Sequence, residues 1–242
     1  HERADTWDEQ AHIAALADVK RDGELALEHA GRRCFAPQDL ASLASLSVQH
    51  PDATILAGGT DVGLWVTKQH RELGTVIYTG RAAELQELST TASHIEIGGA
   101  VSLTDAATVI LEHYPDLTEL FRRFASPPIR NAGTLGGNIA NGSPIGDSMP
   151  ALMVLAASLV LRQGDEEREL RLDDFYQDYQ VNDLRPGEFV ARIRIPREDA
   201  AVRVGSHKWS KRFDQDISAV CTAYRLELNG ETVSTFRMAC GG

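Results

Sequence analysis

The feature that most constrains the fold is a stretch of 25 residues that is almost without charge. Ser126–Pro150 reads SPPIRNAGTLGGNIANGSPIGDSMP and contains five glycines, four of the nine prolines and only two charged residues, Arg130 and Asp147. Such a stretch cannot form an ordinary core, because many backbone groups would be buried without partners. An exposed flexible loop would be shorter or carry more charge. The segment therefore predicts a fixed loop that wraps a polar ligand, with a structural Ω-loop as the alternative.

The residue types of this segment suit a diphosphate that is bound by neutral groups. Gly136 and Gly137 allow a ligand to approach the backbone closely. Asp147 is the only acid and suits ribose-type hydroxyls. Because the segment has no lysine, we expect backbone N–H groups to hold the phosphates. Uncharged donors are supplied by Thr134, Asn138, Asn141 and Ser143.

A second glycine-rich site occurs earlier, where Gly58-Gly59-Thr60-Asp61 follows the strand-like run Thr54–Ala57. A short helix is expected over Val62–Lys68. A strand that turns through two glycines into a helix exposes N–H groups beside the positive end of the helix dipole, which favours phosphate. The alternative is a tight turn in which Asp61 caps the helix. The spacing fits neither a Walker A loop nor GxGxxG.

The rest of the chain predicts an α+β protein in three parts. Residues 1–33 are expected to be a linker or surface helix, 34–200 a ligand-binding domain, and 201–242 the start of an antiparallel sheet, with a boundary near 196–204. A second strand–Gly-Gly–helix unit is expected where Gly98-Gly99 precedes a helix capped at Ser102. Other expected elements are a helix at Leu40–Gln49 and strands at Thr75–Tyr78, His94–Ile97, Leu159–Leu161, Glu169–Leu172, Glu188–Ile195, Ser206–Trp209 and Ile217–Leu228.

Composition excludes several classes of function. A net charge of −11 repels nucleic acid and anionic membranes. The longest apolar run, Ala151–Leu161, is too short to span a bilayer. Three cysteines without metal-ligand spacing predict no metal site and a reducing, cytoplasmic location, with the thiols as small buried residues. The chain begins at His1 and ends directly after a strand-like run, so we expect a piece of a longer polypeptide.

Three motifs resemble the FAD domain of the molybdenum-containing hydroxylases, of the xanthine dehydrogenase type in particular. They are Gly58–Asp61, Ser126–Asp147 and Lys208–Ala219, which reads KWSKRFDQDISA. The resemblance covers Leu25 to Gly242. It implies a two-lobed α+β fold, with a small α/β lobe to about Tyr78, a larger mixed lobe, and FAD between them. A truncated C-terminal sheet domain would follow.

The resemblance also implies which residues contact FAD. Phe124 would pack on a cofactor ring, Asp147 would hold cofactor hydroxyls, and Val190 and Lys208 would make later contacts. Plain core packing remains the alternative for Phe124, and a surface position for Lys208. No side chain is expected to be catalytic in purine oxidation. The two phosphate loops would consist of Ile55, Leu56, Ala57, Gly58, Gly59, Thr60, Asp61 and Val62, and of Thr134, Leu135, Gly136, Gly137 and Asn138.

By the same resemblance, the chain relays electrons. They would come from purine oxidation at molybdopterin, pass through 2Fe–2S clusters to FAD, and reach NAD⁺. The clusters and the molybdopterin would be carried by a missing segment or a partner subunit of a hetero-oligomer. The alternatives are the flavin subunit of CO dehydrogenase, aldehyde oxidase or hydroxybenzoyl-CoA reductase, or a non-enzymatic interaction module.

Overall fold

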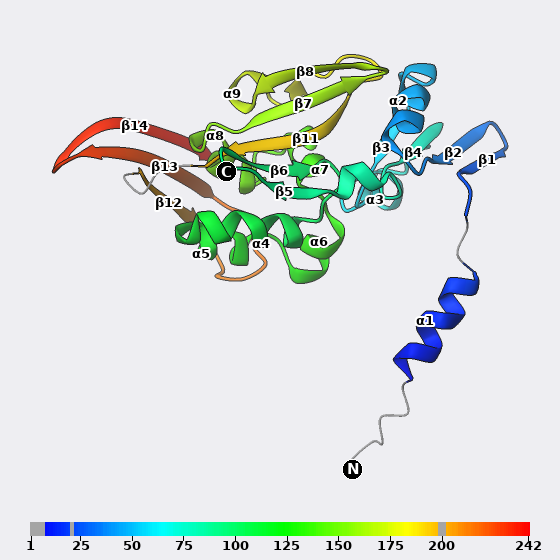
Figure 1. The fold of residues 1–242 in the computed structure, drawn as a ribbon, viewed down its shortest axis with the longest axis horizontal. Coiled ribbons are helices and arrows are strands. Elements are labelled where there is room, and N and C mark those ends of the chain that lie inside the picture. Colours follow the sequence, from blue (N-terminus) through cyan, green and yellow to red (C-terminus); the bar gives the residue numbers. More distant parts are fainter. Residues whose placement is uncertain (1–7, 20–21, 198–201) are drawn as a thin grey trace, which may run out of the picture.

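The computed structural model describes residues 8–19, 22–197 and 202–242. Within them the chain forms a small lobe, a larger lobe and a C-terminal sheet (Figure 1). The predicted α+β class is therefore confirmed. No helix in this described part is long and apolar enough to cross a bilayer.

The small lobe is built on a four-stranded sheet with the order β1-β2-β4-β3. β2 and β3 both run parallel to β4, because helices connect them. The core of this lobe includes Leu43, Ile77 and Leu85, and Phe189 of the larger lobe packs into it. Its elements are β1 (Leu25–His29), β2 (Arg32–Ala36), α2 (Leu40–Gln49), β3 (Thr54–Leu56), α3 (Val62–Thr67) and β4 (Thr75–Tyr78).

The prediction that residues 1–33 form a linker or surface helix is wrong at its C-terminal end, where the first strands of the sheet lie. α1 (Glu9–Asp18) is a surface helix without buried residues, but the sheet begins at Leu25 rather than after residue 33. β1 pairs with β2, which pairs with β4, so residues 25–33 belong to the small lobe. Their weak apolar periodicity reflects a hairpin, whose turn residues Ala30 and Gly31 have φ of 50° and 76°. Residues 1–7 and 20–21 of the predicted linker lie outside the described residues.

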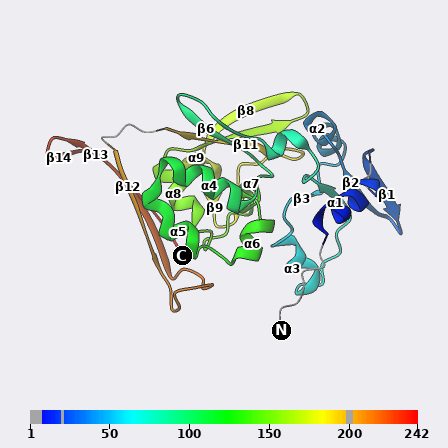
Figure 2. The same ribbon diagram turned by 60° about the horizontal axis from the view of Figure 1, so that its bottom comes forward.

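The larger lobe surrounds a five-stranded antiparallel sheet with the order β5-β6-β11-β7-β8. Helices cover one face of this sheet (Figures 1 and 2), and the core between them includes Ile97, Ile110, Leu152 and Phe175. Its elements are η1 (Ala83–Gln86), β5 (Leu88–Thr90), β6 (His94–Gly98), α4 (Leu103–His113), η2 (Pro115–Leu117), α5 (Thr118–Arg123), α6 (Pro127–Ala132), α7 (Leu135–Asn141), α8 (Ser148–Val154), β7 (Ser158–Gln163), β8 (Glu166–Arg171), α9 (Leu172–Phe175), β9 (Tyr176–Asp178), β10 (Val181–Asn182) and β11 (Phe189–Pro196).

Both predicted strand–glycine–helix units are present. The first joins β3 to α3 and the second joins β6 to α4. In the second unit Ser102 is the N-cap of α4, and its Oγ accepts a hydrogen bond from the Asp105 N–H at 3.0 Å. The two units belong to different lobes, and their glycines Gly58, Gly59 and Gly99 line the same cavity.

The C-terminal sheet is antiparallel, as predicted, and consists of β12 (Val202–Trp209), β13 (Val220–Asn229) and β14 (Thr232–Gly241). Its inner face contributes Val204, Cys221 and Ala223 to the core of the larger lobe. Residues 198–201, where the expected domain boundary falls, lie outside the described residues. The cysteine prediction holds only in part, because Cys221 is buried whereas Cys240 is exposed.

Candidate functional site

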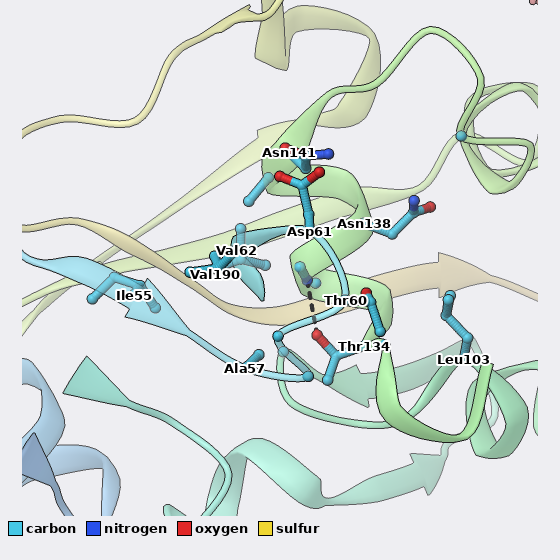
Figure 3. A pocket seen from close by; sticks show the side chains of 18 of the residues that line it. Ile55, Ala57, Thr60, Asp61, Val62, Leu103, Thr134, Asn138, Asn141 and Val190 are labelled. Atoms are coloured by element: carbon cyan, nitrogen blue, oxygen red, sulfur yellow. Dashed lines mark hydrogen bonds between the residues drawn. The ribbon is translucent and has the colours of Figure 1, made fainter. Parts of the chain in front are cut away.

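The two glycine-rich segments meet at a cavity of about 500 Å³ between the lobes (Figure 3). Loop β3–α3 forms one wall, α7 with the residues before it forms the opposite wall, and β11 contributes Phe189 and Val190. A volume of this size lies within the range of small-molecule sites. Of the residues predicted to contact a ligand, the cavity is lined by Ile55, Ala57, Gly58, Gly59, Thr60, Asp61, Val62, Phe124, Thr134, Gly136, Gly137, Asn138 and Val190.

Gly58 brings the two lobes into direct backbone contact. A Cβ atom at this position would lie 1.8 Å from the carbonyl oxygen of Ala132 and 2.7 Å from the Cα of Gly133. Gly59 follows with φ of 69°, a left-handed conformation that favours glycine. The first glycine therefore permits close packing of the lobes, and the second turns the chain into α3.

The uncharged segment is not one continuous loop, which corrects the prediction. It contains two short helices, α6 and α7, and its composition encodes their ends. Pro127 occupies the first turn of α6, Thr134 caps α7, and Gly142 ends α7 in the left-handed conformation. The Thr134 Oγ1 accepts a hydrogen bond from the Gly137 N–H at 3.0 Å, the dashed line in Figure 3.

The start of α7 is fixed by a short ladder to the segment that precedes α4. The Leu103 N–H donates to the Gly133 carbonyl at 2.8 Å, and the Leu135 N–H donates to the Val101 carbonyl at 3.0 Å. A Cβ atom on Gly136 would lie 2.4 Å from the carbonyl oxygen of Gly99. These contacts hold the first turn of α7 against the glycine turn of the larger lobe, with its N-terminus at the cavity.

Among the described residues, the cavity wall contains two acids and no lysine or arginine. Asp61 makes no capping bond to α3; its Oδ2 accepts a hydrogen bond from the Trp65 Nε1 at 2.8 Å. Glu188 accepts two hydrogen bonds of 2.7 Å from the guanidinium of Arg168. Burial would raise the pKa of the Glu188 carboxyl, but bonds from Arg168 and from the Arg185 N–H hold that pKa below its ordinary value. Glu188 is therefore neutralised by a partner, and Asp61 is the acid left to face a ligand.

Asp147 and Lys208 do not line the cavity. The Lys208 Nζ lies 2.5 Å from the Asp147 Oδ2, and the Ser218 hydroxyl donates to the other carboxylate oxygen at 2.5 Å. Both side chains are almost fully buried, with 2% and 1% exposed. The structure pairs the two residues between α8 and the C-terminal sheet. Their placement therefore does not support the predictions that Asp147 holds cofactor hydroxyls and that Lys208 makes a later contact to the cofactor. Lys208 is also not the surface residue of the alternative prediction.

Leu56 and Leu135, two further predicted contacts, are also absent from the cavity wall. Leu135 is fully buried in the core of the larger lobe, and the Leu56 carbonyl accepts the Thr79 N–H at 2.8 Å. Sequence reasoning missed Trp65, although its spacing of four residues from Asp61 on a helix was a usable signal. Asn141 and Ser143, which were predicted as uncharged donors, do line the cavity. The other wall residues that sequence reasoning missed are Thr79, Leu85, Gly99, Leu103, Ala125, Ile129, Gly133, Ala140, Ile145, Gly146, Leu184, Glu188 and Phe189.

Burial also affects the thiol of Cys221, which lies beside Asp147. The Cys221 thiol lies 3.7 Å from the carbonyl oxygen of Asp147. Burial, together with the negative charge of Asp147, raises the pKa of Cys221 to about 12. The thiol is therefore protonated at neutral pH and unsuited to nucleophilic or redox chemistry.

Known proteins resemble this chain in sequence and in fold. It is 29% identical to a xanthine dehydrogenase of Emericella nidulans over 231 residues, which are 90% of the chain but 17% of that protein. It is also 29% identical to the nicotinate dehydrogenase FAD-subunit of Eubacterium barkeri, covering 86% of the chain and 73% of that subunit. A solved carbon monoxide dehydrogenase from Hydrogenophaga pseudoflava superposes with a TM-score of 0.80 and 26% identity, over 86% of the chain and 73% of its match.

The family model that describes the FAD binding domain in molybdopterin dehydrogenase matches residues 28–198. This range includes every residue of the cavity wall and both lobes except the first residues of β1. The chain belongs to the family of FAD-binding domains of the molybdopterin dehydrogenases.

Proposed function

We propose that this chain is the flavin module of a molybdenum hydroxylase of the xanthine dehydrogenase type. In this proposal it binds FAD non-covalently and relays electrons from 2Fe–2S clusters to NAD⁺. The observation that carries the proposal is the cavity between the two glycine-rich segments, within the region that matches the family. Iron–sulfur and molybdopterin components on other segments or subunits complete the enzyme, in line with the small share of xanthine dehydrogenase that the chain spans.

The cavity fits the chemistry of FAD. Its wall offers the glycine turn before α3, the N-terminus of α7 and uncharged polar side chains, which suit a diphosphate. Gly136 and Gly137 let the first turn of α7 pack against Gly99 and the Thr134 side chain, because a Cβ atom would lie 2.4 Å from the Gly99 carbonyl oxygen or 2.8 Å from the Thr134 Oγ1. Phe124 and Val190 provide an apolar wall for a ring system. Asp61 is placed to accept hydrogen bonds from cofactor hydroxyl or N–H groups.

Bound FAD supplies an isoalloxazine ring that exchanges electrons with one-electron and two-electron partners. The residues of this chain bind and orient it. α7 and loop β3–α3 would hold the diphosphate, and Phe124 and Val190 would face the ring. No described side chain of the cavity is needed as a nucleophile or general base. Purine chemistry takes place at molybdenum, outside this chain.

A second candidate substrate class is favoured by the match to a nicotinate dehydrogenase FAD-subunit, which is as similar to this chain as the xanthine dehydrogenase. In both enzymes the substrate would be selected where molybdenum is bound, outside this chain. A xanthine dehydrogenase module and a nicotinate dehydrogenase module would therefore differ only in the partner that delivers electrons to the flavin. The flavin site is the same in both.

The first experiment is a titration of the purified chain with FAD, followed by anaerobic addition of NADH or xanthine. We expect the visible flavin bands to remain with the protein after desalting. NADH should bleach them, whereas xanthine should not, because the molybdenum site is absent. A chain that retains no flavin contradicts the flavin module. A chain whose bound FAD does not react with NADH contradicts NAD⁺ as the acceptor. Adding the purified molybdenum subunit then distinguishes xanthine from nicotinate.

A second prediction tests where the phosphates lie. Thr134→Asp keeps an N-cap side chain on α7 but places a negative charge at the cavity. It is expected to raise the Kd for FAD about tenfold, since like charges repel across a few ångströms. Thr134→Asn, which caps equally well without charge, is the matched control and should leave the Kd nearly unchanged. Equal affinity of both variants would show that the phosphates lie elsewhere.

A further inference from the structure

Arg130 is the only basic residue of the uncharged segment, and it does not line the cavity. Its Nη1 donates to three backbone carbonyl oxygens, those of Phe124 at 2.7 Å, Ala125 at 3.2 Å and Arg122 at 3.2 Å. A guanidinium that faces three carbonyls fixes the backbone that carries them. The Arg130 guanidinium therefore binds the backbone of the protein rather than a ligand in the cavity.

The three carbonyls belong to the end of α5 and to the turn that leads into α6. α5 ends at Arg123, and the last carbonyls of a helix have no partner within it. A positive charge at that end also interacts favourably with the helix dipole. Arg130 lies on α6, so its side chain reaches back and closes the turn between the two helices.

The turn that Arg130 closes is conformationally costly and lies at the cavity. Ala125 has φ of 53°, a left-handed conformation that a non-glycine residue adopts only when its surroundings enforce it. Phe124 and Ala125 both line the cavity, and Phe124 is 8% exposed. The position of this part of the wall thus depends on a strained residue that Arg130 holds in place.

We propose that Arg130 is a positioning residue for the flavin site, which holds Phe124 and Ala125 in the conformation that receives the cofactor ring. The proposal rests on the proposed function, because it assumes that the cavity binds FAD. Arg130 touches neither cofactor nor substrate and acts only through the turn. A lysine ammonium also carries N–H donors, but its flexible stem would hold the turn less rigidly than the planar guanidinium does.

The test uses four variants of the full chain with FAD as the probe: Arg130→Met, Arg130→Lys, Arg130→Met with Ala125→Gly, and Ala125→Gly alone. Arg122→Met is the matched control, because it removes an exposed arginine side chain at the same turn without removing a carbonyl. The readouts are the Kd for FAD, the visible circular dichroism of the bound flavin, and the thermal midpoint.

We expect Arg130→Met to raise the Kd about tenfold and to alter the visible circular dichroism. Adding Ala125→Gly should recover most of the affinity, because glycine adopts positive φ without strain. Arg122→Met should bind like the wild type, and Ala125→Gly alone gives the baseline against which the rescue is measured. This rescue separates positioning from general stability, since glycine in the turn does not restore the lost hydrogen bonds.

An unchanged Kd and spectrum in Arg130→Met, with only a lower thermal midpoint, would overturn the proposal. If Arg130→Met does not fold, a further double variant is made and Arg130→Lys decides in the same way. Arg130→Lys should raise the Kd about threefold, and Arg130→Lys combined with Ala125→Gly should reverse that rise. Failure of the wild-type chain to bind FAD would instead refute the proposed function, so the two failures are distinguishable.

Discussion

Gly58→Ala is expected to weaken FAD binding on the order of 100-fold, because overpacking at a closed contact costs up to about 3 kcal/mol. The added methyl would sit 1.8 Å from the Ala132 carbonyl oxygen. Both neighbours of that methyl are backbone, so no side chain can rotate away, and the two walls of the cavity must separate. The measurement is the Kd for FAD, with secondary structure checked by far-ultraviolet circular dichroism.

The control for this substitution lies five residues further along. Gly63 is in α3, and a Cβ atom added there would have nothing within 4 Å. Gly63→Ala should bind FAD normally and stabilise the protein slightly, because alanine is favoured over glycine in a helix. If Gly58→Ala binds FAD as tightly as Gly63→Ala, the lobe contact does not determine the shape of the site.

Lys208→Met is expected to lower the free energy of unfolding by roughly 3–5 kcal/mol, because it leaves a buried carboxylate without its partner. Asp147 is 1% exposed and keeps only the Ser218 hydroxyl as a side-chain donor. The pair joins the N-terminus of α8 to β12, so the C-terminal sheet should lose its attachment first. Urea unfolding measured by fluorescence gives the free energy.

The double substitution Lys208→Met with Asp147→Asn separates charge from packing. A neutral amide beside methionine removes the unpaired charge, so the double variant should be markedly more stable than Lys208→Met alone. Lys211→Met, at an exposed position, is the surface control and should change the free energy by less than about 0.5 kcal/mol. If Lys208→Met also lowers the free energy of unfolding by less than about 0.5 kcal/mol, the buried pair contributes little to stability.

Much of the fold could be predicted because local sequence patterns indicate its strands, helices and helix caps. The apolar run before Gly58 is a strand, Ser102 caps a helix, and the alternating residues near Ile193 form the central strand of a sheet. The two helices of the uncharged segment were missed, since its composition resembles a loop. Their signals were nevertheless present in Pro127 and Gly142.

The limits of the site prediction have a physical cause. Asp147 and Lys208 are 61 residues apart, and only tertiary packing makes them partners. Glycines were interpreted as places where a ligand approaches the backbone. For Gly58 and Gly136, what approaches within van der Waals distance is another backbone segment of the protein. A single sequence shows that a side chain is missing, but it does not show what occupies the space.

Glycines let three chain segments at the cavity touch through their main chains. Gly136 rests on the carbonyl of Gly99, and a Cβ atom on Gly99 would lie 2.2 Å from the carbonyl of Val190. Three chain segments are thus stacked peptide on peptide, with no side chain between them. Contacts between main chains do not depend on the side chains around them. Sequences can therefore diverge widely at those side chains and still keep the same main-chain contacts beside the cofactor. We therefore expect most substitutions to be tolerated at the positions whose side chains line this site. Almost none should be tolerated at the few glycines that let the main chains touch.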